Sequence, residues 1–234
     1  MMAMRAEVLP EPELEFGGGA RHIDPRFGLT NYGPADLGSG EGPRAVRLGL
    51  VGDAASMDLL RTWLERCRDA IPAKDERYGH LFSEFPGCDI DRGLHAAMVC
   101  SDRASNPVSA RALREIDTAT GTEAIERAVE SYAEEARILA EQNRVDVILI
   151  ARPQELHDIG SRPTKGRGRK RAKARPTKAQ DDDPGLRWAN FHDLLKAELL
   201  NLGVPIQVIR RSTFDETTAP PKGGSRQDEA TRAW

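Results

Sequence analysis

The sequence is poor in aromatic residues, which make up 5% of its 234 positions. That share leaves few large side chains for a broad stacking surface, although 39% hydrophobic residues suffice for a packed core. No apolar run reaches the roughly 18 residues that a membrane-spanning helix needs, and the N-terminus shows no signal-peptide core. We therefore expect a cytoplasmic protein without a membrane partner, of one domain or one and a half.

Catalytic and metal-binding motifs are also scarce. The three cysteines, at 67, 88 and 100, form no Cys-x-x-Cys pair, so we expect small buried thiols rather than a zinc site or a disulfide framework. The five histidines are scattered, and His157 with Asp158 is better explained as a turn than as a general base. Gly17–Gly19 lacks the spacing of a dinucleotide fingerprint and is expected to be a turn. The sequence therefore predicts no enzyme.

Charge is distributed unevenly along the chain. There are 34 basic and 37 acidic residues, for a formal net charge of −3. Residues 165–178 (KGRGRKRAKARPTK) hold eight of the basic residues and no acid, which leaves −11 on the rest of the chain. Three aspartates follow at 181–183, and we expect residues 162–184 to form a flexible basic and acidic loop. A tolerated surface insertion and a phosphate-binding arm both explain such a loop.

Apolar periodicity predicts alternating strands and helices. Strands are expected at residues 46–51, 94–100, 145–151 and 205–209, and helices at about 57–71, 122–143 and 191–202. Pro72 and Gly203 are expected to end the first and the last of these helices. This order predicts an α/β, Rossmann-like fold, in which a parallel sheet is flanked by helices and preceded by an irregular N-terminal segment.

Ligands bind beyond the carboxyl ends of the strands in such sheets, which directs attention to the start of the helix at residue 191. Asn190 suits an N-cap with Asp193 three residues on, so free backbone N–H groups would form an anion site there. His192 and Lys196 are four residues apart and lie one above the other on the helix. Gln207 on the next strand offers an amide donor. Spacing alone leaves open whether these groups bind a ligand or are ordinary surface residues.

Several segments together resemble short prokaryotic Argonaute proteins. Residues 11–19 (EPELEFGGG), 22–34 (HIDPRFGLTNYGP) and 46–52 are similar to the opening of these proteins. Residues 145–151 (VDVILIA), 191–197 (FHDLLKA), 202–210 (LGVPIQVIR) and 212–214 (STF) are similar to a strand, helix and strand of the Argonaute MID domain. The resemblance implies an N-terminal extended segment at 1–44 and a MID domain at 45–225. It also implies that 226–234 begin a MID/PIWI junction helix, with the family's second lysine and PIWI domain cut off.

The resemblance implies a module that holds the 5′ end of a guide strand. In the family, a Tyr or His, a Lys four residues on and a Gln on the following strand hold the 5′-phosphate and the first nucleotide; His192, Lys196 and Gln207 match in type and order. Residues 152–190 correspond to the loop that senses the first base. Magnesium is expected to bridge the phosphate, and no catalytic residue is implied. Further backbone phosphate contacts are expected from Arg152, Arg210 and Lys178.

The implied partners are a guide nucleic acid, with RNA favoured, and a single-stranded DNA target from an invader. A separate chain with an APAZ domain and a TIR, SIR2 or nuclease effector completes the defence complex in the family. The alternative, from a different class, is an interaction scaffold. In that case a sheet edge or an apolar helix docks the APAZ chain, and the phosphate pocket is vestigial.

Overall fold

The computed structural model describes residues 10–40, 42, 45–74, 83–119, 122–152, 190–218 and 227–234. The chain divides into two compact units. Unit 1 comprises Met1–Ala45, Glu65–Met98 and Gln227–Trp234, and unit 2 comprises Val46–Leu64 and Val99–Arg226. The expected loop at 162–184, with its basic tract and Lys178, lies outside the described residues, as do His157 and Asp158.

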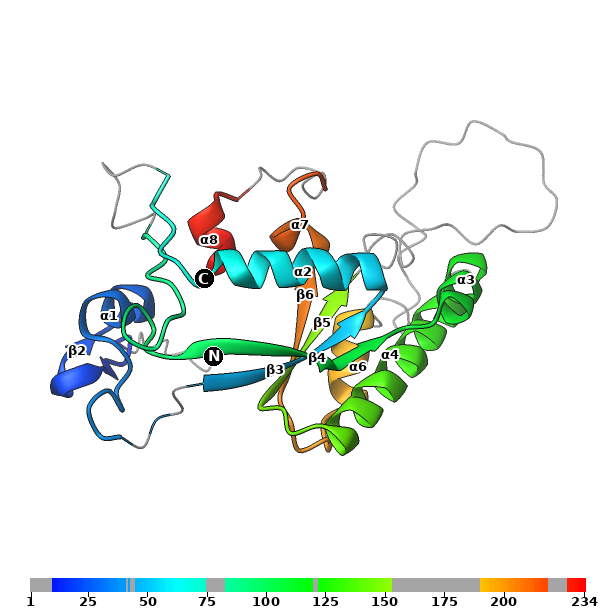
Figure 1. Ribbon diagram of the computed structural model, residues 1–234, viewed down its shortest axis with the longest axis horizontal. Helices are drawn as coiled ribbons and strands as arrows, with labels where there is room; N and C mark the ends of the chain where they lie inside the picture. The colour runs from blue at the N-terminus through cyan, green and yellow to red at the C-terminus, as the bar shows by residue number, and fades with distance from the viewer. Residues whose placement is uncertain are drawn as a thin grey trace, which may run out of the picture. The chain divides into compact units, whose positions relative to one another are not determined.

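Unit 2 is built on a four-stranded sheet in the order β4-β3-β5-β6 (Figure 1). The strands are β3 (Ala45–Gly52), β4 (Ala97–Pro107), β5 (Val147–Arg152) and β6 (Ile206–Arg210). β5 runs parallel to both β3 and β6. Just after β4, the Val108 N–H donates to the carbonyl of Gly52 at the end of β3, so the carboxyl ends of these two strands also lie together. The expected α/β fold with a parallel sheet flanked by helices is confirmed.

Helices cover both faces of this sheet because β3 and β5 are apolar on both sides. A Cβ added at Gly49 of β3 would lie 2.4 Å from Leu139 of α4 (Thr122–Gln142). Gly52, three residues on and therefore on the other face, approaches Met57 of α2 (Ala54–Arg66). These close approaches leave no room for side chains at the two glycines and bring α4 and α2 directly onto opposite faces.

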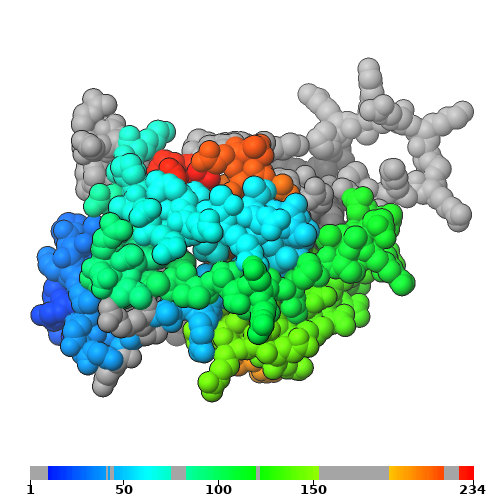
Figure 2. All heavy atoms as spheres, viewed as in Figure 1, coloured from blue at the N-terminus to red at the C-terminus, as the bar shows by residue number. Residues whose placement is uncertain are grey.

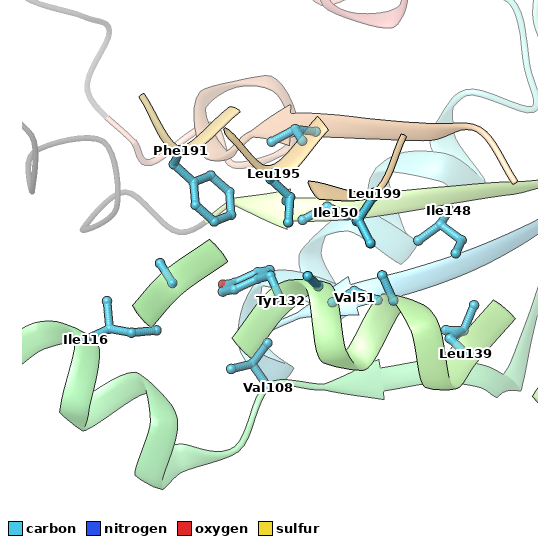
Figure 3. Close-up of a cluster of buried hydrophobic side chains, with 14 of the residues drawn as sticks. Val51, Val108, Ile116, Tyr132, Leu139, Ile148, Ile150, Phe191, Leu195 and Leu199 are labelled. Atoms are coloured by element: carbon cyan, nitrogen blue, oxygen red, sulfur yellow. The ribbon is translucent and has the colours of Figure 1, made fainter. Parts of the chain in front are cut away.

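The core on the α4 side also holds α6 (Phe191–Glu198) in place. Tyr132 of α4 is fully buried and packs edge-on against Phe191, with ring centroids 5.3 Å apart (Figure 3). Ile148 and Ile150 of β5 and Leu195 of α6 complete the same cluster. Because Phe191 is the first residue of α6, this packing determines where the helix begins on the sheet.

Two elements differ from expectation: α2, on the other face of the sheet, and the edge strand β4. α2 begins at Ala54 because the Asp53 carboxylate accepts the Ser56 N–H at 2.9 Å, and it ends at Arg66. The chain then leaves the helix, and Ile71 pairs with Phe85 in an isolated antiparallel bridge, so Pro72 does not end it as predicted.

β4 was expected at 94–100 but spans Ala97–Pro107, because an edge strand accepts the polar residues that follow Cys100. Figure 2 shows α2 against β4, where Arg61 of α2 donates to Asp102 and Ser105 of β4.

The remaining boundaries agree more closely. α4 and the start of α6 lie where the periodicity places them, but α6 ends at Glu198 and continues as turns to Gly203, whose φ is 77°. A helix that the sequence did not predict, α3 (Ala110–Thr118), begins where the Ser109 hydroxyl accepts the Ala112 N–H. A short α7 (Arg211–Phe214) follows β6 directly. In the described part of the chain, no helix combines the length and apolar character needed to cross a membrane.

Unit 1 contains a small hairpin followed by a helix. β1 (Leu14–Glu15) and β2 (Arg21–His22) pair in antiparallel fashion through η1 (Gly17–Gly19), which confirms the expected turn; Gly18 and Gly19 there have φ of 68° and 76°. α1 (Pro25–Tyr32) follows. Phe16 is buried, and its ring packs directly against Gly28 of this helix. A Cβ at Gly28 would lie 2.1 Å from the ring, so only glycine leaves room for it.

Unit 1 also holds two of the three cysteines. Cys67 and Cys88 are buried and free, as expected, while Cys100 of β4 is half-buried. Burial raises the pKa of the Cys67 thiol to about 12 and that of Cys88 to about 11. Nearby, α8 (Glu229–Ala233) leads to Trp234, which packs edge-on against Phe85. The interpretation of this helix as a domain junction stays a prediction.

Candidate functional site

Two arginines end the neighbouring strands β5 and β6. Arg152 lies opposite Arg210 in the parallel register. Opposite positions of neighbouring strands send their side chains to the same face of a sheet. The Arg152 guanidinium carbon lies 5.5 Å from the centroid of the Phe191 ring, which identifies this face as the one that α6 covers. The carboxyl edge of the sheet therefore carries two guanidinium groups beside the first turn of α6.

The Arg152 side chain is held in place by a buried aromatic ring. Phe191 is only 2% exposed and is itself fixed by Tyr132. A cation over a ring face gains about 0.5–2 kcal/mol, depending on how far it is desolvated. Arg152 is half-buried and Arg210 is exposed, so one guanidinium is oriented by the core and the other can adjust to a ligand.

The N-terminus of α6 is capped as the sequence predicts. The Asn190 amide oxygen accepts the Asp193 N–H at 3.0 Å, and the Asn190 amide donates in return to the Asp193 carboxylate. His192 Nδ1 lies 2.7 Å from Asp193 Oδ1. Hydrogen bonds from His192 and Asn190, with the nearby charge of Lys196, hold the pKa of Asp193 below its ordinary value. The Asp193 carboxylate therefore stays ionised at neutral pH.

The Asp193 carboxylate opposes the binding of an anion at the start of α6. Asp193 places a negative charge in the first turn of α6, where the helix dipole favours an anion. A bound phosphate would meet that charge as well as the cations of Arg152, Arg210 and Lys196. An anion bound at this helix end would therefore meet a competing acid.

The predicted side chains that the structure describes lie on α6, β5 and β6, but not all on the same face of the sheet. His192 and Lys196 are both half-buried on α6. Gln207 pairs with Leu149 in the middle of β6, three residues before Arg210. Strand alternation therefore sends the exposed Gln207 side chain to the face opposite to Arg210, away from the face that α6 covers.

A metal ion has few ligands here. Within the residues that the structure describes, no group of three or more His, Cys, Asp and Glu side chains is suited to hold one. Asp193 is the acid in the first turn of α6 and offers a single carboxylate. Magnesium bound through one carboxylate takes its remaining oxygens from phosphate and water. The donor set thus fits magnesium only together with a phosphate ligand.

A polar cluster that the sequence reasoning missed follows β6 directly in the chain. Asp215 is 5% exposed and accepts hydrogen bonds from Arg211 Nε at 2.7 Å and from the Thr217 N–H at 2.9 Å. Burial acts to raise the pKa of Asp215, but hydrogen bonds from Thr217, Arg211 and Thr218 outweigh it and lower that pKa. The sequence feature that could have indicated this contact is an Arg and an Asp four residues apart, at 211 and 215.

Comparison with known proteins gives no assignment. No family model matches the sequence, and no curated protein is significantly similar to it.

Proposed function

We propose that this chain binds the 5′-phosphate of a single-stranded guide, with RNA favoured, and carries out no chemistry itself. The phosphate is held at the start of α6 and at the carboxyl ends of β5 and β6. The proposal follows the resemblance to the MID domain of short prokaryotic Argonautes. In that role the chain serves guide-directed recognition of invading DNA in the cytoplasm, beside an APAZ chain with a TIR, SIR2 or nuclease effector.

One observation carries the proposal. Arg152 and Arg210 lie opposite each other at the carboxyl edge of a parallel sheet, and Arg152 is oriented by the ring at the first position of α6. Guanidinium groups match phosphate oxygens in geometry and charge. His192 and Lys196 on α6 add two more donors. Magnesium, when bound, would offset the charge of Asp193 against that of the phosphate.

Binding of two matched RNAs tests the proposal. A 5′-phosphorylated RNA should bind more tightly than the same RNA with a 5′-hydroxyl, measured by fluorescence polarisation over a salt series. Arg152→Ala, Arg210→Ala and Lys196→Ala should each reduce this difference. A lost charged hydrogen bond costs about 1.5–3 kcal/mol, which is roughly ten-fold or more in affinity.

The salt series separates specific from general attraction, because contacts to any phosphate weaken as salt rises. Arg103→Ala is the matched control, since Arg103 is an exposed arginine on β4. Equal affinities for both RNAs in the wild-type protein would exclude a phosphate site.

The Gln207→Ala variant distinguishes the role that the resemblance implies for Gln207 from its position in the structure. The resemblance implies that Gln207→Ala weakens phosphate binding as much as Lys196→Ala does. The position of Gln207 on the opposite face implies a much smaller effect. A large loss on Gln207→Ala would show that the ligand reaches around the end of β6.

A second candidate function is supported by Asp193. A carboxylate in the first turn of α6 is also what a vestigial phosphate pocket would show, in a chain that serves as a scaffold for an APAZ partner. In that case both RNAs bind equally, and the Arg152→Ala and Lys196→Ala proteins still form a complex with the co-expressed partner.

A further inference from the structure

Cys67 and Cys88 lie close together in unit 1. The Cys88 N–H donates to the Cys67 carbonyl at 2.9 Å. The covalent bonds and the hydrogen bond that join the two Cα atoms span at most about 7 Å, so the Cα atoms are no farther apart than that. Disulfide bonds usually join residues whose Cα atoms are about 4.4–6.8 Å apart. The backbone therefore holds the two cysteines at a separation that suits a disulfide.

Backbone contacts on both sides fix this arrangement. Ile71 and Phe85 exchange both backbone hydrogen bonds, at 2.8 and 2.9 Å. Cys88 pairs with Gly93 in a second antiparallel bridge. Gly93 has a φ of 64°, and a Cβ there would lie 2.2 Å from the Gly87 carbonyl oxygen, so only glycine fits this turn. The segment that carries Cys88 is thus anchored beside the residues that follow α2.

The two thiols are buried together and are not ionised at neutral pH. Cys67 is 4% exposed and Cys88 is 1% exposed, and both are free. Burial is the main cause of the raised pKa of Cys67, and the charge of Cys88 raises it further. This electrostatic interaction shows that the two side chains are near each other. Because the thiolate is the reactive form, both cysteines resist oxidation while unit 1 is intact.

α8 and Trp234 cover the segments that carry the cysteines. Arg66, the residue before Cys67, forms an ion pair with Glu229 of α8 at 2.7 Å. Charged groups of α8 act directly on the Cys67 thiol. Trp234 packs edge-on against Phe85, with ring centroids 5.4 Å apart. Release of α8 would therefore bring solvent to the two thiols.

We infer that Cys67 and Cys88 form a reversible disulfide, which a small disulfide oxidant such as oxidised glutathione makes once α8 is released. One cysteine, as its thiolate, attacks a sulfur of the oxidant and releases one glutathione. The other then attacks the protein sulfur of the mixed disulfide and releases the second glutathione. The two cysteines lose two protons and two electrons, which the oxidant gains. The inference is independent of the proposed function, because both cysteines lie in unit 1.

Oxidation of the full chain tests the inference. A Cys100→Ser protein, which keeps only the pair, is incubated with oxidised glutathione, digested and examined by mass spectrometry. We expect a peptide in which Cys67 is linked to Cys88, and dithiothreitol should reverse the link. The disulfide closes the chain from 67 to 88, so the oxidised protein should unfold at a higher urea concentration. A further Cys67→Ser or Cys88→Ser substitution should abolish both effects.

A variant that loosens α8 tests the role of this helix as a cover. Trp234→Ala removes the contact with Phe85, so we expect the link to form about five-fold faster or more. Leu200→Ala, at an exposed leucine of unit 2, is the control and should leave the rate unchanged. In the protein with Trp234 intact, urea below the unfolding midpoint should also accelerate the link, which provides a second measurement if Trp234→Ala does not fold.

Two outcomes would overturn the inference. The first is a protein that keeps two free thiols, or carries a separate glutathione on each cysteine, both in urea below the midpoint and in a folded Trp234→Ala variant. The second is a rate that neither Trp234→Ala nor urea changes, since the thiols would then react without release of α8.

Discussion

Arg152 and Arg210 are paired in register as the last residues of two parallel strands. Two like charges so close together repel each other unless an anion or a ring compensates them. Arg152 has the Phe191 ring beneath it, and Arg210 is exposed. Under the proposed function, a bound phosphate adds to the ring in compensating this repulsion.

Asp193→Asn should strengthen binding of a 5′-phosphorylated RNA. The ionised Asp193 carboxylate repels the phosphate, and a unit charge about 4 Å away costs roughly 1 kcal/mol in water, which is about five-fold in affinity. Asparagine keeps the polar shape and removes the charge. Fluorescence polarisation at low salt measures the effect. Glu198→Gln, at the other end of α6, is the control and should leave affinity unchanged. Weaker binding by Asp193→Asn would indicate that the carboxylate assists the ligand, as a magnesium ligand does.

Phe191→Leu should weaken phosphate binding without removing a charge. It deletes the ring under Arg152 and the edge-on contact with Tyr132, so we also expect a loss of about 1 kcal/mol in the free energy of unfolding. RNA binding and urea denaturation measure the two effects. Leu139→Ala is the control: it opens the same core far along α4 and should lower stability while leaving the phosphate preference intact. Equal phosphate preference in Phe191→Leu and the wild type would show that the ring does not orient Arg152.

Asp215→Ala should destabilise unit 2 by about 2 kcal/mol. The side chain is buried, and its loss leaves the Arg211 guanidinium and the Thr217 N–H without their acceptor. Urea denaturation measures the loss. Asp102→Ala is the matched control, because Asp102 also accepts from an arginine but its side chain is 98% exposed, and it should cost far less. Similar losses in the two variants would contradict the importance of burial.

Asp146 should titrate at unusually low pH. Hydrogen bonds from the side chain and the backbone N–H of Arg47 lower the pKa of Asp146 to about 2. Because this pKa lies below the roughly 3.9 of an unfolded aspartate, the stabilising effect is complete above that pH and is lost as pH falls toward 2. NMR titration of the carboxyl carbon measures the midpoint. Asp146→Asn should remove this part of the acid dependence, and an ordinary midpoint in the wild type would contradict it.

Much of unit 2 was predictable because its signals are local. The apolar spacing of α4 extends over most of its 21 residues, and its bounds were predicted within one residue. Asn190 with Asp193 marks the start of α6 for the same reason, since both the cap and the helix lie within a few residues. Local patterns predicted less well where tertiary contacts determine the end of an element. Residues 67–71 keep helical spacing but leave α2 because Ile71 pairs with Phe85.

The candidate site likewise has some features that local spacing predicts and others that it does not. His192 and Lys196 were predictable as neighbours because helix spacing alone puts them together. The face to which Gln207 points depends on strand alternation relative to Arg210, and a change of one residue reverses it. Asp193 was recognised as part of a cap, but its contact with His192 depends on side-chain geometry that spacing does not encode. The guide function, its partners and the bound magnesium remain predictions.

The buried cysteines make the opening of unit 1 measurable by itself. Cys67 and Cys88 are protonated and shielded at neutral pH, so a thiol reagent can modify them only in molecules whose unit 1 has opened. Cys100 belongs to unit 2 and serves as an internal comparison. The rates of modification at Cys67 and Cys88, read by mass spectrometry, thus time the opening of unit 1 in the intact chain, while half-buried Cys100 reports the reactivity of a partly accessible thiol.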